Sequence, residues 1–224
     1  MINKINKNVI FMGQPGAGKG TVASLLSKTS NLIHLSTGNI FRNEIAQKTE
    51  LGLKVQNIVT TGGYVPDEIT NKIVENAILK LKENNQFFIL DGFPRTKAQA
   101  EFLNSLKDFE FVVIELQVNN EEIIKRLSGR RTCVNCGAGY HVEFQPPKVE
   151  GVCDVCSNQI IQRADDTPER IEHRLKIYEE QTKPLIDYYK SLDELRVVDG
   201  SATPEEVAKQ VLEILQKSDK INKL

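Results

Sequence analysis

The stretch GQPGAGKGT, residues 13–21, decides the fold of this chain. The apolar run NVIFM precedes it, and a helical pattern follows it from Gly18 to about Lys28. A G-x-x-x-x-G-K pattern between a strand and a helix is typical of a loop whose backbone N–H groups surround a phosphate. The helix N-terminus adds partial positive charge, and Lys19 can reach the outer phosphates of a nucleotide. The alternative, a glycine-rich turn without a ligand, is disfavoured because strand, loop, lysine and helix are all in place.

The loop departs from the usual pattern directly after its lysine. Gly20 stands where most such loops have the Ser or Thr that binds Mg²⁺. Thr21 follows one place later, about 100° further round the helix, so we interpret its hydroxyl as a phosphate ligand. We therefore expect Mg²⁺ to be held mainly by nucleotide oxygens and water, with help from an acidic residue elsewhere.

Three further apolar runs are typical of buried strands, and helical patterns lie between them. They are QFFILD, FVVIELQV and LRVVDG, at residues 86–91, 111–118 and 195–200. This alternation predicts an α/β fold, a parallel sheet with helices on both faces. We expect Asp67 to cap one helix, and the capping box that begins at Thr203, with Pro204 at the first helical position, to open the C-terminal helix.

Two segments break the alternation and are predicted to be insertions in the α/β core. Residues 37–66 hold two helical patterns without a strand, and residues 130–164 hold the cysteines among glycine, proline and polar residues. Each insertion is therefore expected to form a small unit of its own beside the sheet.

A second phosphate site is indicated by DGFPRT, residues 91–96, which follows a predicted strand. Ligands of open α/β sheets gather at the carboxyl ends of strands, so Asp91 should lie near the phosphate loop, where it can order Mg²⁺-bound water. Gly92 allows close backbone approach, and Arg95 offers a planar fork suited to phosphate. Arg42 lies one turn into a predicted helix and could converge with Arg95 on the same phosphate. The alternative is a turn and a capped helix, each with a surface arginine.

The four cysteines form the pattern C-x₂-C-x₁₆-C-x₂-C, with Cys133, Cys136, Cys153 and Cys156 as candidate metal ligands. Such a set predicts a closed tetrahedral S₄ site, for which Zn²⁺ is the first choice and iron the second. A site filled by four protein ligands is structural, because no position remains open for a substrate. Four unrelated thiols, or two disulfides, are the alternative.

Composition narrows the function classes further. The chain has 224 residues, 29 Lys plus Arg, 30 Asp plus Glu and a net charge of −1, which argues against a general nucleic-acid or membrane binder. No apolar stretch approaches the roughly 20 residues needed to span a bilayer. We therefore expect a cytoplasmic protein, in which thiols stay reduced and bind metal.

Five motifs, GQPGAGKGT, STGNIFR, DGFPRT, GRR and RADD, occur in an order that resembles adenylate kinase, and the cysteine insertion resembles the zinc-bearing LID of many bacterial members. The resemblance implies a P-loop NTPase-type core of residues 1–36, 67–129 and 165–224. It implies that residues 37–66 close over AMP and that residues 130–164 form the LID over ATP. The implied reaction is MgATP plus AMP giving two ADP, by a monomer with structural Zn²⁺ and nucleotide-bound Mg²⁺.

The resemblance also implies roles for individual residues. The implied ATP-binding residues are Gly16, Ala17, Gly18, Lys19, Gly20, Thr21, Arg126, Arg130, Tyr140, His141 and Gly200. The implied AMP-binding residues are Thr37, Arg42, Gly92, Arg95, Gln99, Arg163 and Arg174. The implied catalytic residues are Lys19, Asp91, Arg130, Arg163 and Arg174. Arg126 and Arg130 would share one face if their helix continues that far, and we expect His141 to be a surface residue near ATP. Arg131 and Arg170 are interpreted as solvated surface charges.

Two competing hypotheses remain at this stage. Relatives that phosphorylate UMP or CMP resemble this chain but tend to have alanine at the position of Thr37, so another nucleoside monophosphate is one alternative. The other is a nucleic-acid-binding zinc ribbon joined to a nucleotide switch, although few basic residues surround the cysteines. Asn39 departs from the family's usual aspartate, which places any hydrogen bond made there in question.

Overall fold

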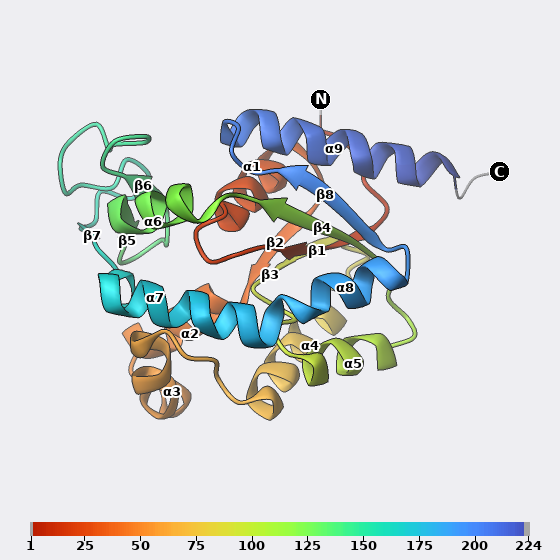
Figure 1. Cartoon of the computed structure of the whole chain (residues 1–224), viewed down its shortest axis with the longest axis horizontal. Helices are drawn as coiled ribbons and strands as arrows, with labels where there is room; N and C mark the ends of the chain where they lie inside the picture. Colours follow the sequence, from red (N-terminus) through yellow and green to blue (C-terminus); the bar gives the residue numbers. More distant parts are fainter. Residues whose placement is uncertain (1, 222–224) are drawn as a thin grey trace.

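A computed structural model describes residues 2–221 of the chain. Within these residues the central sheet has five parallel strands in the order β2-β3-β1-β4-β8 (Figure 1). The strands are β1 (Asn8–Met12), β2 (Ile33–Ser36), β3 (Phe88–Asp91), β4 (Phe111–Gln117) and β8 (Leu195–Asp199). The predicted α/β fold is confirmed.

Helices cover both faces of the sheet, which explains why the inner strands β1, β3 and β4 are nearly continuous apolar runs. Val9 and Phe11 of β1 face one core, built with α1 (Lys19–Thr29), α6 (Asn120–Gly129) and α9 (Pro204–Ile221). Ile10 and Met12 face the other core, built with α4 (Asp67–Glu83), α5 (Lys97–Ser105) and α8 (Pro184–Ser191). Burial on both sides removes the polar alternation of a half-exposed strand.

The segments predicted as insertions contain separate small cores. In the first, α2 (Thr37–Ala46) and α3 (Glu50–Thr61) pack around Phe41, Val55 and Val65. In the second, an antiparallel sheet of β5 (Arg130–Cys133), β6 (Gly139–His141) and β7 (Ile160–Ile161) surrounds a core of cysteines with Tyr140 and Ile160. The chain then returns through η1 (Ala164–Asp166), α7 (Pro168–Ile177) and the π-helix η2 (Tyr178–Thr182) into α8.

One prediction about helix ends is wrong, one depends on a condition that the structure does not meet, and one is confirmed. Pro66, not Asp67, precedes α4 as its cap, and the Asp67 carboxylate instead accepts hydrogen bonds from α5. Helix α6 ends at Gly129, so Arg130 lies on an extended strand and does not share a helix face with Arg126. The capping box at Thr203 is present, because its hydroxyl accepts from the Glu206 N–H and the Glu206 carboxylate accepts in return.

Gly129 marks the change from α6 to β5 because the ring of His141 lies against its backbone. A Cβ atom at this position would come 2.2 Å from the His141 Nε2 atom. A side chain there would displace the ring and with it the pairing of β5 with β6.

No helix within residues 2–221 is long and apolar enough to cross a membrane.

Candidate functional site

The loop between β1 and α1 adopts the conformation that a phosphate cradle requires. Gly13, Gly16 and Gly18 have φ values of 126°, 90° and 92°, in the region that favours glycine. A Cβ atom on Gly13 would lie 2.5 Å from the backbone oxygen of Leu116, so only glycine fits between β1 and β4. The loop then enters α1 at Lys19, and the first N–H groups of α1 are available to an anion.

Lys19 is held inside this loop rather than extended into solvent. Its Nζ atom donates to the backbone oxygens of Gly13 and Gln14, at 2.6 and 2.8 Å. Burial lowers the pKa of Lys19 to about 8; Asp91 offsets part of this effect, and the positive charges of Arg95, Arg174 and Arg130 add to it. Asp91 thus compensates the buried ammonium charge only in part, and a nucleotide phosphate would supply further negative charge.

The pKa of Lys19 predicts that MgATP binding takes up protons at alkaline pH. Because bound phosphates stabilise the charged ammonium, the pKa rises on binding, and the neutral fraction of Lys19 must be protonated. We expect an uptake of about 0.7 proton per chain at pH 8.5 and about 0.1 at pH 7, measured by calorimetry in buffers of different ionisation enthalpy. Lys54→Met, at an exposed lysine, should leave this uptake unchanged. Uptake that is the same at both pH values would contradict the assignment.

Asp91 lies at the carboxyl end of β3, beside the phosphate loop as predicted. A Cβ atom on Gly20 of α1 would come 3.3 Å from the Asp91 Oδ2 atom, and His34 Nε2 lies 3.1 Å from the same oxygen. Burial alone would raise the pKa of Asp91, but hydrogen bonding and charge from His34, with Lys19 and Arg95, lower it to about 2. The carboxylate is therefore ionised at neutral pH and suited to hold the water shell of Mg²⁺.

A second pocket, beside Gly92, collects all but one of the residues predicted for the second substrate; Arg163 does not line it. The lining residues come from α2, the turn after β3, α5 and α7, and they include Thr37, Arg42, Gly92, Arg95, Gln99 and Arg174. The convergence of Arg42 and Arg95 is thus present in the structure. Arg95 Nε donates to the backbone oxygen of Gly92 at 2.7 Å, and its guanidinium lies over the ring of Tyr64, 5.0 Å from the centroid. Tyr64 is a lining residue that the sequence did not suggest.

Asn39, which stands where the family usually has aspartate, still forms a hydrogen bond with Arg42. Its Oδ1 atom accepts from Arg42 Nη2 at 2.7 Å, so an amide oxygen serves in place of a carboxylate. A Cβ atom on Gly137, in the first cysteine loop, would come 3.8 Å from the Asn39 amide. The cysteine-bearing unit and the α2–α3 unit therefore meet at this residue.

Four arginines, Arg42, Arg130, Arg163 and Arg174, gather at this pocket, and two of them, Arg42 and Arg174, line it. Burial lowers the pKa of Arg42 to about 10, and burial also lowers the pKa values of Arg163 and Arg174. The charge of Arg130 lowers all three further. Mutual repulsion of this kind favours a polyanionic ligand, because a phosphate placed among them would neutralise several cations at once.

Asp166 holds two of these arginines in place. Its side chain is fully buried and accepts from Arg130 Nε and Nη2, at 2.8 and 2.5 Å, and from Arg174 Nη1 at 2.8 Å. Asp165 forms a second ion pair with Arg174, at 2.9 Å. The sequence did not indicate a role for these carboxylates, although both belong to the RADD motif that begins at Arg163.

Arg126 and Gly200, both predicted to bind ATP, lie together on the other side of the phosphate loop. Arg126 Nη1 donates to the Gly200 backbone oxygen at 2.8 Å, and its Nε atom pairs with Glu122 at 2.8 Å. A Cβ atom on Gly18 would lie 3.8 Å from Arg126, which places the guanidinium next to the loop. This plane beside the loop is suited to stack on a nucleotide base.

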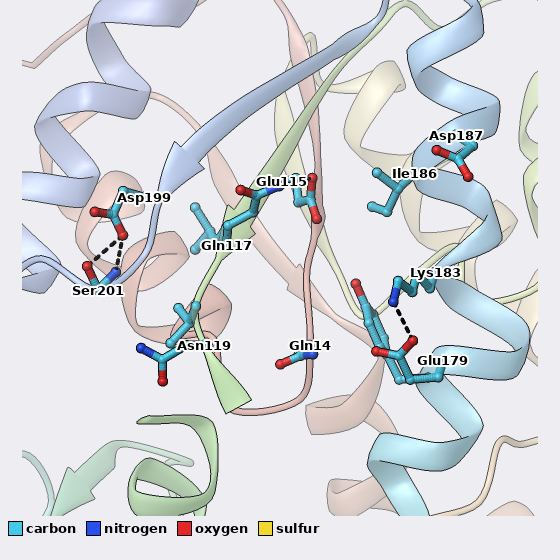
Figure 2. Close-up of a pocket in the computed structure, with 13 residues that line it drawn as sticks. Gln14, Glu115, Gln117, Asn119, Glu179, Lys183, Ile186, Asp187, Asp199 and Ser201 are labelled. Carbon is cyan, nitrogen blue, oxygen red and sulfur yellow. Dashed lines mark hydrogen bonds and ion pairs between the residues drawn. The ribbon is translucent and has the colours of Figure 1, made fainter. Parts of the chain in front are cut away.

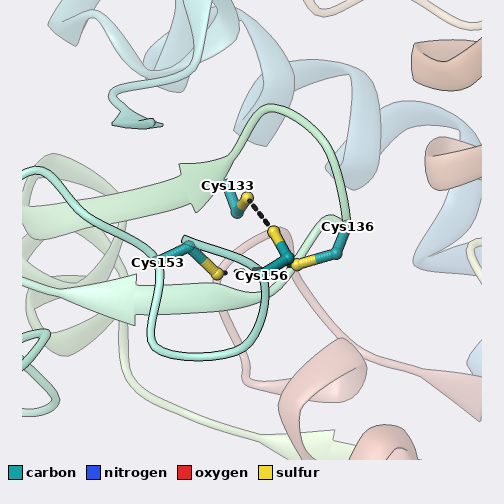
Figure 3. A group of neighbouring side chains, drawn as sticks. All are labelled: Cys133, Cys136, Cys153 and Cys156. Carbon is teal, nitrogen blue, oxygen red and sulfur yellow. Dashed lines mark hydrogen bonds between the residues drawn. The ribbon is translucent and has the colours of Figure 1, made fainter. Parts of the chain in front are cut away.

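The four cysteines converge as the spacing predicted (Figure 3). Their sulfur atoms all lie within 4.8 Å of one another, with Cys133–Cys156 at 3.4 Å and Cys136–Cys153 at 3.6 Å. Zn–S bonds of about 2.3 Å in a tetrahedron place sulfurs about 3.8 Å apart, so the set fits such an ion. All four cysteines are free thiols, and the disulfide alternative is therefore not what the structure shows.

Tyr140 and His141 belong to the support of this unit rather than to an exposed face. Tyr140 is buried, and its hydroxyl lies 3.3 Å from Cys153 Sγ and accepts from the Asp154 N–H at 2.8 Å. His141 is buried too, and its Nδ1 atom accepts from the N–H groups of Glu143 and Phe144. The expectation that His141 is a surface residue is wrong; the predicted contacts of both residues with ATP stay predictions.

A larger cavity, of about 540 Å³, lies between the carboxyl half of β4 and the helices η2 and α8. Figure 2 shows Gln14 of the phosphate loop, Glu115 of β4 and Ile186 of α8 around it. Burial raises the pKa of Glu115, although its hydrogen bond with Gln117 acts in the opposite direction. Within residues 2–221, which the structure describes, none of the predicted site residues lines this cavity.

A phosphate loop, a second arginine-lined pocket and a cluster of cations between them define a nucleoside monophosphate kinase with the P-loop fold. The chain belongs to the adenylate kinase family, since the family model described as adenylate kinase matches residues 11–194. Relatives agree. An adenylate kinase of Ruminiclostridium cellulolyticum is 47% identical over 211 residues, which cover 92% of this chain and 98% of the relative. One from Thermosipho africanus is 44% identical over 215 residues, which cover 94% of this chain and all of the relative.

Proposed function

We propose that the chain transfers the terminal phosphoryl group of MgATP to AMP, giving two ADP, with the two nucleotides on opposite sides of the arginine cluster. The observation that carries this proposal is the grouping of Arg42, Arg130, Arg163 and Arg174: Arg42 and Arg174 line the second pocket, and Arg130 and Arg174 lie near enough to Lys19 of the phosphate loop to lower its pKa. Reversible transfer of this kind would keep the adenine nucleotides in balance.

The reaction needs no general base from the protein. The phosphate oxygen of AMP that attacks is already largely ionised at neutral pH, because its second pKa is about 6. The barrier arises from crowding of negative charge and from the alignment of two phosphates. Buried cations that are already in place stabilise that charge without reorganisation, so catalysis consists of positioning and electrostatics.

The residue roles follow from the two sides of the cluster. We propose that residues Gly16–Thr21, Arg126 and Gly200 bind ATP, and that Thr37, Arg42, Gly92, Arg95 and Gln99 bind AMP. Arg130, Arg163 and Arg174 would surround the transferred group together with Lys19. Mg²⁺ bound to the nucleotide would screen phosphate charge, and the ionised Asp91 carboxylate would hold its water ligands.

We also propose a division of the chain into three units. Residues 1–36, 67–129 and 165–224 form the core, residues 37–66 the AMP-binding unit and residues 130–164 the LID. Separate small cores in the two insertions support this division. Reduced thiols at the sulfur cluster support a cytoplasmic enzyme with structural Zn²⁺ held by the four cysteines, and we propose that it acts as a monomer.

Arg95→Ala tests the assignment of the second pocket. Because its guanidinium lines that pocket and not the phosphate loop, we expect the KM for AMP to rise roughly 10–100-fold while the KM for ATP changes less than about 2-fold. Initial rates of ADP formation with either nucleotide varied give both constants. The exposed neighbour Lys97 provides the control Lys97→Ala. Equal increases in both KM values would remove Arg95 from the AMP site.

Cys153→Ser tests whether the metal holds shape. With one thiolate lost, we expect the zinc content per chain to fall sharply and Tm to fall by roughly 10 °C, with activity retained at low temperature. Metal analysis and thermal unfolding measure the two changes. Ser157→Ala, in the same loop, is the matched control. Complete loss of activity in a folded variant would instead give the metal a direct part in the reaction.

A further inference from the structure

A hydrogen-bonded chain behind the second pocket links α4 to α5. Gln99, 2% exposed, donates from its Nε2 atom to Asp67 Oδ1 at 2.7 Å and accepts at its Oε1 atom from the Arg95 N–H, also at 2.7 Å. The other Asp67 oxygen accepts from the Thr96 hydroxyl at 2.9 Å. Asp67 was expected to cap α4, but its carboxylate instead holds the Gln99 amide.

These partners leave only one orientation for the Gln99 amide. The Arg95 N–H can only donate, so it requires the amide oxygen, and both oxygens of Asp67 accept, one from Gln99 and one from the Thr96 hydroxyl, so the amide must turn its nitrogen toward Asp67. A flipped amide would set NH₂ against N–H and oxygen against carboxylate. Each of these contacts would leave a buried polar group unpaired, so both partners oppose the flip.

The fixed amide presents a defined pattern to the pocket that it lines with Thr37, Arg42 and Arg95. One N–H of Nε2 and one lone pair of Oε1 remain unused. Such a pair complements a ring nitrogen that accepts beside an amino group that donates, which is the edge of adenine at N1 and N6. A 6-oxopurine presents N1–H beside a carbonyl oxygen, which is the opposite pattern.

We infer that Asp67 is a positioning residue that makes the second pocket select a 6-aminopurine monophosphate over its 6-oxo counterpart. This inference rests on the proposed function, because it assumes that the base of AMP reaches Gln99. Asp67 does not line the pocket and acts through Gln99. A site whose polar groups match one base is left with unpaired groups by the other, and discrimination of about 10⁴-fold is attainable this way.

The test compares AMP with IMP, which has nearly the same shape and the inverted hydrogen-bond edge. The measurement is kcat/KM for each monophosphate at saturating MgATP, and the KM for ATP at saturating AMP. In Asp67→Leu the amide loses its acceptor and gains freedom to turn. We expect the ratio of AMP to IMP efficiency to fall at least 10-fold, with the KM for ATP within 2-fold of the wild type.

Two control variants separate positioning from stability. In Asp67→Asn the new amide oxygen can still accept from Gln99 Nε2 and its NH₂ can donate to Thr96, so the ratio should stay within about 2-fold of the wild type. Glu68→Leu removes an exposed acid from the same helical turn without touching Gln99 and should leave the ratio unchanged. If Asp67→Leu fails to fold, Asp67→Ser, with a shorter polar side chain, replaces it with the same expected fall.

The outcomes are distinct from those of the proposed function. A wild-type protein without activity toward AMP would remove the proposed function and this inference together. A wild type that prefers AMP, with a ratio that stays within 2-fold in Asp67→Leu or Asp67→Ser, would overturn the inference alone. A fall that Asp67→Asn shares would also overturn it, because charge rather than amide orientation would then be responsible.

Discussion

Arg163→Met is expected to lower kcat on the order of 10³-fold while leaving the free energy of unfolding of the nucleotide-free protein unchanged or slightly higher. The reason lies in the surroundings of this guanidinium. Within residues 2–221 it forms no ion pair, and its Nε atom donates to the Thr132 hydroxyl at 2.8 Å. Burial and then the charges of Arg130 and Arg42 lower its pKa, so its positive charge is unfavourable until an anion arrives.

We therefore propose that the Arg163 side chain contributes to the reaction and lowers the stability of the fold. Methionine keeps an apolar stem of similar length and removes the repulsion, so the folded state should not suffer. Arg131→Met provides the control, since the neighbouring Arg131 bonds only to backbone oxygens of Ser128 and Arg130 among the contacts described. Stopped-flow or initial-rate kinetics and urea unfolding measure the two quantities. A variant that is destabilised and retains its kcat would identify Arg163 as a structural residue.

Asp166→Asn is expected to destabilise the protein by about 3–5 kcal/mol and to lower kcat as well. The wild-type carboxylate is fully buried and compensates Arg130 and Arg174 together. The amide is nearly the same size but carries no charge and turns an N–H group toward one guanidinium. Both arginines then lose the buried anion that fixes them, and we expect the two side chains, which are proposed to surround the transferred phosphate, to move apart.

The measurement for Asp166→Asn is urea unfolding with and without saturating nucleotide. A phosphate can replace part of the missing negative charge, so the deficit should shrink when nucleotide is bound. Asp108→Asn is the matched control, because Asp108 pairs with Lys82 on the surface and exposed pairs contribute about 0–1 kcal/mol. A loss below about 1 kcal/mol for Asp166→Asn would show that the two arginines need no buried partner.

The sequence predicted the parts of the fold that depend on local patterns. The strands β1, β3 and β4 are apolar on both faces, and their runs stand out from the helices between them. The edge strand β8 was predicted from its run LRVV, although of these residues only Val198 is fully buried. Strand β2 was not predicted, because its sequence IHLS is short and only Ile33 and Leu35 in it are apolar. It lies at the edge of the sheet and pairs with β3 alone. Its pairing with β3, and not its own composition, makes it a strand.

The candidate site was predictable where a motif carries its own chemistry, as at Lys19, Asp91 and the cysteines. The supporting contacts were not, because they join residues distant in the chain. The sequence around Asp67 predicts a helix cap, and only the position of α5 shows that Asp67 bonds to Gln99 instead. The sequence around Arg130 is compatible with a helix, and only the ring of His141 against Gly129 shows why the helix ends before it. Asp166 shows its role only once β5 and α7 lie on either side of it.

The most direct test of the account is the rate of ADP formation from MgATP with AMP, GMP, CMP and UMP as the second substrate. Because Thr37, Gln99 and the three pocket arginines form one site, kcat/KM for AMP should exceed that for each other monophosphate on the order of 10³-fold or more. No activity with AMP, or a higher kcat/KM with another nucleoside monophosphate, would contradict the account.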